Sequence, residues 1–197
     1  MPISKNPKHT HLLRQLSISA ALVLAASGSA HAIEYTAVDT ANSSVTFSYQ
    51  QMGVNMDGSF STLEAPQFSF DPANPANASV VLQIPLAGID VGTAEANAEV
   101  EKGEWLNTPA HPLASFKSSK VEALGDNRYQ VTGKLAIKGK TQTVATPFTL
   151  EEKDGAAFFM GTFTLKRADF DVGEGDWSDF SIVANDIKIA FKLSARP

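Results

Sequence analysis

Two adjacent stretches of the chain alternate between apolar and polar side chains with a period of two residues. In residues 129–137 the odd-numbered positions hold apolar side chains or glycine, and in residues 144–150 the larger apolar side chains fall on even-numbered positions. Because successive strand side chains point to opposite faces, each stretch predicts a strand with one apolar face. Gly139 lies between the stretches and suits a tight turn, so together they predict an antiparallel hairpin.

The same alternation recurs along most of residues 33–197. Turn-forming sequences separate the runs, and Pro85 is expected at a strand end or edge because proline cannot donate to a ladder. About eight to ten strands with one apolar face each predict an all-β antiparallel sandwich or up-and-down barrel. The clearest runs outside the hairpin are residues 45–50, 67–70, 79–86, 113–121, 157–166 and 187–194.

Residues 93–106 do not alternate and are rich in alanine and glutamate, which favours one short helix. Thr93 is expected to cap this helix and Gly103 to end it, with Trp105 following as an anchor. No sequence repeat or long internal linker divides residues 33–197, so they are predicted to form one domain.

The inward positions of the predicted strands are unusually rich in phenylalanine, but three of them hold glycine. Gly58, Gly133 and Gly161 either leave volume for a ligand or accommodate strand curvature and close packing. An eight-stranded barrel can fill its interior with side chains or hold one small ligand, so the pattern alone leaves both open. The inward phenylalanines are Phe47, Phe60, Phe68, Phe70, Phe116, Phe148, Phe159, Phe163 and Phe191.

The first 32 residues have the pattern of a secretory signal peptide. Three basic residues precede an apolar run over residues 16–26, and small residues lead to Ala30-His31-Ala32. This order predicts cleavage after Ala32, and export to the periplasm of a Gram-negative cell fits it best. The apolar run is too short to span a bilayer and nothing later approaches that length, so no stable membrane insertion is expected.

Charge and composition narrow the partners of the exported chain. Of 16 lysines and arginines, Lys5, Lys8 and Arg14 lie in the leader, whereas all 21 acidic residues follow it, which leaves a net charge of −8. Such an acidic chain is a poor ligand for nucleic acid or anionic lipid headgroups. The sequence has no cysteine, so an exported domain of this size must be stable through its core alone.

Catalytic and metal chemistry have few candidate residues. His111 is the only histidine after the leader, so a site of clustered histidines is excluded, and a packed loop position is its simpler interpretation. The acidic loop at residues 169–179 departs from a calcium loop because Glu174 occupies the position of the invariant glycine. No catalytic residue, metal site or cofactor is therefore predicted.

Five motifs, in order, resemble those of the YceI family of polyisoprenoid-binding, lipocalin-like periplasmic proteins. Residues 95–104 depart from the family, which usually has basic groups on the helix that is acidic here. The resembling segments are residues 42–47 (S-x-V-x-F), 57–60 with 68–72 (G-x-F and F-D-P), 109–118 (Y-P-x-A-x-F-x-S), 133–141 (G-x-L-T-I-x-G-x-T) and 166–170 (R-x-D-F).

The resemblance implies a lipocalin-like antiparallel β-barrel of about eight strands and one short helix around an elongated apolar tunnel. It implies a protein that is not an enzyme and that binds, stores or carries an isoprenoid lipid, polyprenyl or quinone-like. Arg167 and His111 are the candidate headgroup contacts, although an ion pair with Asp169 or Asp171 is an alternative for Arg167. The residues expected to line the tunnel are Phe47, Tyr49, Phe60, Phe68, Phe70, Leu82, Ile84, Trp105, Phe116, Val131, Gly133, Leu135, Phe148, Phe159, Gly161, Phe163, Ile189 and Phe191.

Two other classes of function stay open at this point. An enzyme acting on an isoprenoid-like substrate inside the tunnel would need a nucleophile–base pair or paired carboxylates, and the inward positions are almost wholly apolar. A stress-response interaction protein with a fully packed barrel would show the same alternation as a carrier. An exposed strand edge would also allow a homodimer. If Gly133 and Gly161 leave room for the ligand, bulky residues there should reduce lipid uptake without preventing folding.

Overall fold

A computed structural model describes residues 33–197; the predicted signal peptide lies outside the described residues. Within residues 33–197, eleven strands form one antiparallel sheet, more than the eight to ten that the alternation predicts, because the two-residue strands β1 and β6 count as well. The strands are β1 (Ala37–Val38), β2 (Ser44–Gln51), β3 (Val54–Phe60), β4 (Glu64–Ser69), β5 (Ser79–Pro85), β6 (Ile89–Asp90), β7 (Leu113–Gly125), β8 (Arg128–Ile137), β9 (Lys140–Lys153), β10 (Ala156–Lys166) and β11 (Asp186–Arg196). The one α-helix in the described part of the chain is α1 (Ala94–Val100), and the 3-10 turns there are Thr40–Asn42, Pro75–Asn77, Leu86–Gly88, Arg167–Phe170 and Gly175–Ser178.

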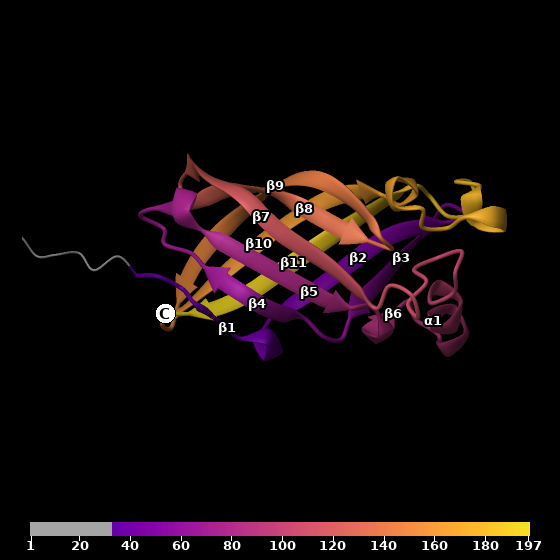
Figure 1. The fold of residues 1–197 in the computed structure, drawn as a ribbon, viewed down its shortest axis with the longest axis horizontal. Coiled ribbons are helices and arrows are strands. Elements are labelled where there is room, and N and C mark those ends of the chain that lie inside the picture. The colour runs from indigo at the N-terminus through magenta and orange to yellow at the C-terminus, as the bar shows by residue number, and fades with distance from the viewer. Residues whose placement is uncertain (1–32) are drawn as a thin grey trace, which may run out of the picture. The chain divides into compact units, whose positions relative to one another are not determined.

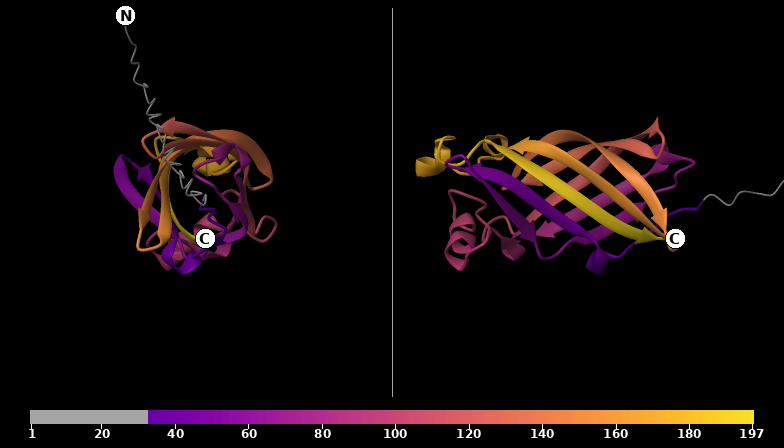
Figure 2. Two further views of the ribbon diagram at one scale, coloured as in Figure 1. Left: turned by 90° about the vertical axis from the view of Figure 1, so that its left-hand side faces the viewer. Right: turned by 180° about the vertical axis from the view of Figure 1, so that it is seen from behind.

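The sheet curls around a common interior, as the end-on view in Figure 2 shows. Its strand order is β4-β5-β7-β8-β9-β10-β11-β2-β3-β6, with β1 paired to β11. The chain itself joins the two edges, because β3 near one edge continues into β4 at the other and β5 continues into β6 through Leu86–Gly88. The predicted all-β antiparallel barrel is confirmed.

The predicted hairpin at residues 129–150 is formed by β8 and β9. Lys138 and Gly139 make its turn with φ values of 49° and 76°, the positive values that both central residues of a type I′ turn require. Val131 pairs with Thr146 across the ladder, and both side chains are buried. The alternation of the two strands therefore places one face of the hairpin in the core.

The helix is shorter than the sequence pattern predicts. Thr93 caps it as expected, since its Oγ1 accepts a hydrogen bond from the Ala96 amide at 3.2 Å. The helix ends at Val100, three residues before Gly103. The chain then turns back, with the Leu106 amide donating to the Val100 carbonyl at 3.0 Å, so that Trp105 packs into the interior. Among the described residues, no helix has the length and apolar character needed to cross a bilayer.

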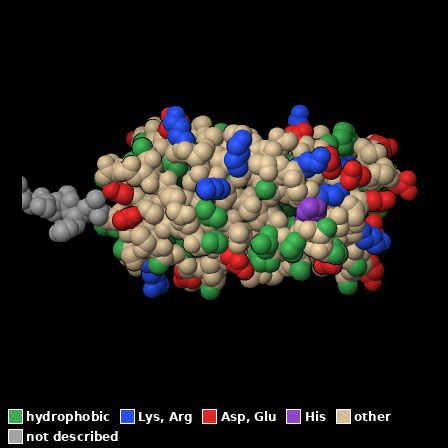
Figure 3. All heavy atoms as spheres, viewed as in Figure 1, with side chains coloured by type: hydrophobic (Ala, Val, Ile, Leu, Met, Phe, Trp, Pro, Cys, Tyr) green, Lys and Arg blue, Asp and Glu red, His purple; other side chains and the backbone are tan. Residues whose placement is uncertain are grey.

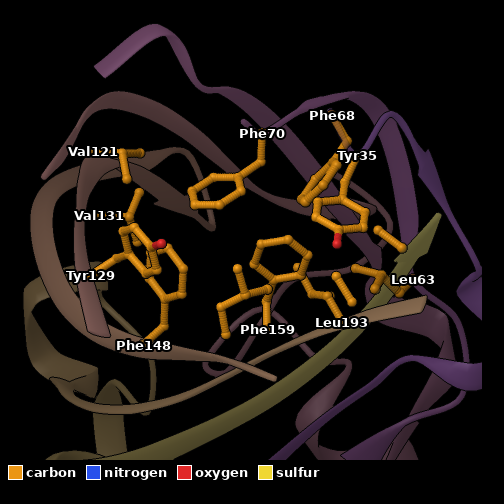
Figure 4. Close-up of a cluster of buried hydrophobic side chains, with 13 residues drawn as sticks. Tyr35, Leu63, Phe68, Phe70, Val121, Tyr129, Val131, Phe148, Phe159 and Leu193 are labelled. Carbon is orange, nitrogen blue, oxygen red and sulfur yellow. The ribbon is translucent and has the colours of Figure 1, made fainter. Parts of the chain in front are cut away.

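The barrel end that carries β1 and the C-terminus is filled by aromatic rings (Figures 1 and 4). Phe70 lies at the centre of this cluster, with its ring edge-on to Tyr129 at 5.1 Å and to Phe159 at 5.1 Å between centroids. Edge-to-face contacts are a preferred arrangement of aromatic pairs. Tyr35, just after the predicted cleavage site, joins the cluster through a backbone bridge to Phe70. This end of the barrel is therefore closed by packed side chains.

Tyr35 makes stability sensitive to alkaline pH. Burial, together with its 2.6 Å hydrogen bond to Glu152 and the negative charge of that carboxylate, raises the pKa of Tyr35 to about 12. The folded protein thus favours the neutral phenol, whose unfolded pKa is about 10. We expect this stabilisation to be complete below pH 10 and to be lost as the pH rises from about 10 to 12. Urea midpoints measured at several alkaline pH values should show a smaller loss of stability with rising pH for Tyr35→Phe than for the wild type. Equal losses of stability would contradict this role of Tyr35.

Candidate ligand-binding site

Two cavities lie inside the barrel. The first, here called the aromatic cavity, has a volume of about 150 Å³ and is bounded by the aromatic cluster. The second, the helix-end cavity, has a volume of about 270 Å³ and lies against α1 and the segment of residues 165–183. Ile189 of β11 lines both, so the two cavities adjoin at that side chain. Protein interiors contain few voids larger than a water molecule, so volumes of this size are not ordinary packing imperfections.

The aromatic cavity offers almost no polar group. Its side chains are aliphatic or aromatic except for Ser115 and Thr146, and the Thr146 hydroxyl lies within hydrogen-bonding distance of the Thr162 carbonyl at 3.2 Å. Because water needs several polar partners, an apolar cavity tends to stay dry and to accept apolar ligands. The aromatic cavity is therefore suited to a hydrocarbon chain.

The predicted tunnel positions fall on these two cavities, with the exception of the two glycines. A contact with a ligand remains a prediction for each residue. The sequence pattern missed lining residues from irregular segments, such as Leu63, Phe170 and Val183, because a loop has no period that marks an inward side chain. The aromatic cavity is lined by Phe68, Phe70, Leu82, Ile84, Phe116, Val131, Leu135, Phe148, Phe159, Phe163, Ile189 and Phe191, and the helix-end cavity by Phe47, Tyr49, Phe60, Trp105 and Ile189.

The space beside Gly133 and Gly161 is already occupied. A Cβ atom at Gly133 would overlap the ring of Phe116 and lie 2.5 Å from the Lys117 carbonyl oxygen. At Gly161 it would meet the ring of Phe191 and lie 2.6 Å from a backbone carbonyl. Each glycine thus makes room for a phenylalanine ring of a neighbouring strand, and neither leaves volume for a ligand. The expectation that a bulky residue there would reduce uptake without preventing folding is wrong for this steric reason.

Gly133→Ala should therefore reduce stability. Overpacking a core typically costs about 1–3 kcal/mol, and here a backbone carbonyl must move as well as a ring. Gly103→Ala is a matched control, because no heavy atom lies within 4 Å of a Cβ at that glycine, and we expect a change within about 0.5 kcal/mol. Urea denaturation measures both. A Gly133→Ala variant as stable as Gly103→Ala would contradict the packing described here.

Arg167 is buried without a carboxylate partner. Its side chain is 2% exposed, and no ion pair among the described residues includes it, so the expected pairing with Asp169 or Asp171 is wrong. All five of its N–H groups donate to backbone carbonyls, at 2.6–3.2 Å. The acceptors are the carbonyls of Val172, Gly173, Trp177, Val183 and Ala184.

This arrangement gives Arg167 a structural task. Because every donor is in use, the guanidinium has no N–H left for a ligand headgroup, which corrects the prediction of such a contact. Burial lowers the pKa of Arg167, and the rings of Trp105 and Phe180 lie 5.6 and 5.1 Å from its Cζ. The side chain fixes the backbone of residues 172–184 where part of that segment lines the helix-end cavity.

The turn between β8 and β9 is attached to the same segment. Lys138, whose side chain is only 7% exposed, pairs with Glu174 at 2.7 Å and donates to the Asp171 carbonyl. Lys140 pairs with the Asp171 carboxylate at 2.7 Å, and this hydrogen bond raises the pKa of Lys140. Both contacts hold the acidic segment against the barrel.

His111 is half-buried beside the same turn and lines neither cavity. A Cβ atom at Gly139 would lie 3.0 Å from its Cε1, which agrees with a packed loop residue and gives no support to a headgroup contact. Within residues 33–197, no three histidine, cysteine or acidic side chains lie close enough together to hold a metal ion.

The helix-end cavity has the polar groups that the aromatic cavity lacks. Tyr49, Gln51 and Glu99 line it together with both tryptophans, whose rings are 5.3 Å apart. Burial raises the pKa of Tyr49, so its phenol stays neutral. Trp177 donates its Nε1–H to Glu99 at 3.2 Å. The sequence predicted Trp105 as a tunnel-lining residue, but not its contact with Trp177.

Trp105 differs from Trp177 in one respect. Its Nε1 is buried and has no hydrogen-bond partner, and it is the only such side-chain atom in the described part of the chain. Leaving a buried donor unpaired costs about 1–3 kcal/mol.

The architecture can now be compared with known proteins. The family model of the YceI-like domain matches residues 36–195, nearly the whole described chain. The chain belongs to the YceI-like family. Other similar proteins are UPF0312 proteins of Ectopseudomonas mendocina (34% identical over 165 residues, 78% of this chain and 85% of that protein) and Vibrio parahaemolyticus (30% identical over 187 residues, 88% and 95%).

Solved structures share the fold. BcnA of Burkholderia cenocepacia is 40% identical to this YceI-like chain, with a TM-score of 0.77 over 80% of this chain and 99% of that one. A polyisoprenoid binding domain from Saccharophagus degradans has a TM-score of 0.64 over 83% of this chain and 98% of that one. Since the second is only 14% identical, it shows the YceI-like fold alone. The resemblance inferred from the five motifs is confirmed.

Proposed function

We propose that this YceI-like domain binds, stores or carries an isoprenoid lipid, polyprenyl or quinone-like, in the periplasm. The observation that carries the proposal is the pair of adjoining cavities, about 150 and 270 Å³, in place of a filled barrel core. The Saccharophagus degradans domain, which shares the fold, is a polyisoprenoid binding domain, and this supports the proposal. The predicted leader supports the location, and no cofactor other than the lipid is proposed.

The apolar chain would supply most of the affinity. Burying one methylene contributes about 0.8 kcal/mol, so each five-carbon isoprene unit contributes up to roughly 4 kcal/mol. Immobilising a ligand costs about 4–15 kcal/mol, which a few buried units exceed. A weak headgroup site would then be sufficient.

Binding is favoured over catalysis by the chemistry of the lining. The aromatic cavity has no acid or base in its wall. Glu99 is the only carboxylate that lines the helix-end cavity, and it accepts hydrogen bonds from both Lys102 and Trp177. A single carboxylate so engaged is a poor general base, because that role needs a free acceptor within reach of the substrate. The open volume of the two cavities likewise favours a binding protein over a protein whose packed barrel serves only as a scaffold.

A chain-length series tests the proposal. Both tryptophans of the sequence line the helix-end cavity, so their fluorescence should report on prenyl alcohols titrated into ligand-free protein. We expect affinity to rise by roughly tenfold or more with each added isoprene unit, and to level off once both cavities are filled. Affinity that does not depend on chain length would contradict burial of the chain.

A further inference from the structure

The helix-end cavity has one fully buried hydrogen-bond donor that the protein itself does not use. Trp105 is 9% exposed and lines this cavity, and its Nε1–H has no acceptor. Two neighbouring donors are engaged, since Arg167 binds backbone carbonyls through every N–H and Trp177 binds Glu99. Tyr49 and Gln51 also line the cavity, but both are less deeply buried than Trp105. Buried polar groups in folded proteins are nearly always paired, so an unpaired one at a cavity wall indicates a missing partner.

The indole of Trp105 is held in place by its surroundings. Its Cζ3 edge faces Gly173, where a Cβ atom would lie 3.3 Å away, and its ring packs against Trp177 at 5.3 Å. The guanidinium of Arg167 lies 5.6 Å from the ring centre. The N–H is on the opposite edge of the indole from Cζ3, so it points away from Gly173. The nitrogen itself has almost no accessible surface, so an acceptor oxygen reaches it only after a small movement of the surrounding side chains.

Charge at this end of the barrel disfavours an anionic headgroup. The hydrogen bond from Lys102 lowers the pKa of Glu99, so a carboxylate is present at the cavity wall. Glu101 and Glu104 also belong to the segments around the cavity, whereas Glu174 is paired with Lys138, and Figure 3 shows acidic side chains at this end together with basic ones. Arg167 is cationic but cannot donate to a phosphate. The remaining polar groups, Tyr49 and Gln51, are neutral.

We propose that the Trp105 Nε1–H donates a hydrogen bond to a neutral acceptor oxygen, a carbonyl or hydroxyl, on the headgroup of the bound lipid. This interaction places the headgroup in the helix-end cavity and directs the apolar chain past Ile189 into the aromatic cavity. The inference rests on the proposed function. It adds an orientation for the ligand and excludes phosphorylated prenyl lipids as the preferred class.

Affinity measurements by calorimetry separate the hydrogen bond from packing. The probes are four-unit prenyl chains that carry a benzoquinone, a hydroxyl, an unsubstituted phenyl ring or a diphosphate. Trp105→Phe keeps an aromatic ring but removes the N–H. It should weaken binding of the quinone or the alcohol about three- to tenfold. The affinity for the phenyl probe should change less than about twofold. Trp177→Phe, which alters the same cavity without removing the unused donor, should not discriminate between these probes.

Three outcomes would overturn the inference: equal weakening of oxygenated and phenyl probes by Trp105→Phe, no weakening of either, or tightest binding of the diphosphate. If the wild type binds none of the probes, the phenyl one included, the proposed function itself fails. The relative loss for quinone and alcohol identifies the acceptor.

A second measurement follows the Trp105 N–H of the wild-type protein directly. In ¹⁵N-labelled protein the two tryptophans give two indole N–H resonances, which Trp105→Phe assigns. The Trp105 resonance should move downfield when an oxygenated probe is added and should move less with the phenyl probe, because only the former supplies an acceptor. Identical shifts with both probes would contradict the hydrogen bond.

Discussion

Replacing Arg167 with alanine is expected to destabilise the domain by more than about 3 kcal/mol, because the change leaves five backbone carbonyls without their donor and each buried unpaired group costs about 1–3 kcal/mol. Water entering the space should recover part of that cost. Urea denaturation measures the loss, and amide hydrogen exchange should show that residues 172–184 open first.

Two further variants make the Arg167 experiment specific. Arg167→Lys keeps the charge but supplies only three N–H donors, so an intermediate loss is expected. Arg128→Ala removes an exposed arginine and should change stability by no more than about 0.5 kcal/mol. An Arg167→Ala variant no less stable than Arg128→Ala would show that the carbonyl contacts are not what holds this segment.

Replacing Ile189 with tryptophan should weaken binding of long prenyl chains much more than binding of short ones. Ile189 lies where the two cavities adjoin, so a larger side chain there should block passage of one chain through both. We expect affinity for a chain that needs both cavities to fall more than about tenfold, since each isoprene unit excluded removes up to roughly 4 kcal/mol. A one- or two-unit chain should lose only a few-fold.

Lys188→Trp is the matched control for Ile189→Trp, because Lys188 is the preceding residue and its side chain is exposed. This variant should bind both chain lengths as the wild type does. Overpacking at Ile189 is expected to cost about 1–3 kcal/mol of stability, so denaturation curves must accompany the titrations. Equal losses for short and long chains would mean that the cavities do not form one continuous site.

The sequence predicted the features that depend on local order. The alternation in β8 and β9 is a period of two along the chain, and it identified Val131 and Leu135 as inward-facing without knowledge of their neighbours. Turn chemistry likewise predicted Gly139, whose positive φ only a permissive residue adopts easily. The five motifs identified the family because each consists of such strand and turn residues.

Contacts between distant segments were beyond the sequence pattern. The ring of Phe116 covers Gly133 because of the register of β7 on β8, which shifts between Ser118 and Lys120 and leaves no trace in the alternation. Lys138 meets Glu174 across 36 residues of chain.

The hydrogen-bond environment of Arg167 could not be predicted from the sequence pattern either. It depends on a loop in which Asp171 and Gly173 take positive φ values, and irregular loops have no periodic signal. Trp105 was predicted as an anchor, but only the surrounding structure reveals that its N–H is unpaired.

The decisive distinction between a carrier and a packed barrel also lies outside the sequence. Both have apolar inward positions, and only the volume left between side chains separates them, which here is about 150 Å³ in the aromatic cavity and 270 Å³ in the helix-end cavity. Filling these cavities with an apolar chain would remove about as much hydrocarbon from water as a few isoprene units contain, which is the physical basis of the proposed function.

The most direct test is to express the full-length chain with its leader in a Gram-negative host, purify the protein from the periplasm and analyse its organic extract by mass spectrometry. We expect a prenyl lipid with a neutral, oxygen-bearing headgroup at close to one molecule per protein. Protein that emerges from the periplasm folded and free of lipid, and that takes up no prenyl chain afterwards, would contradict it.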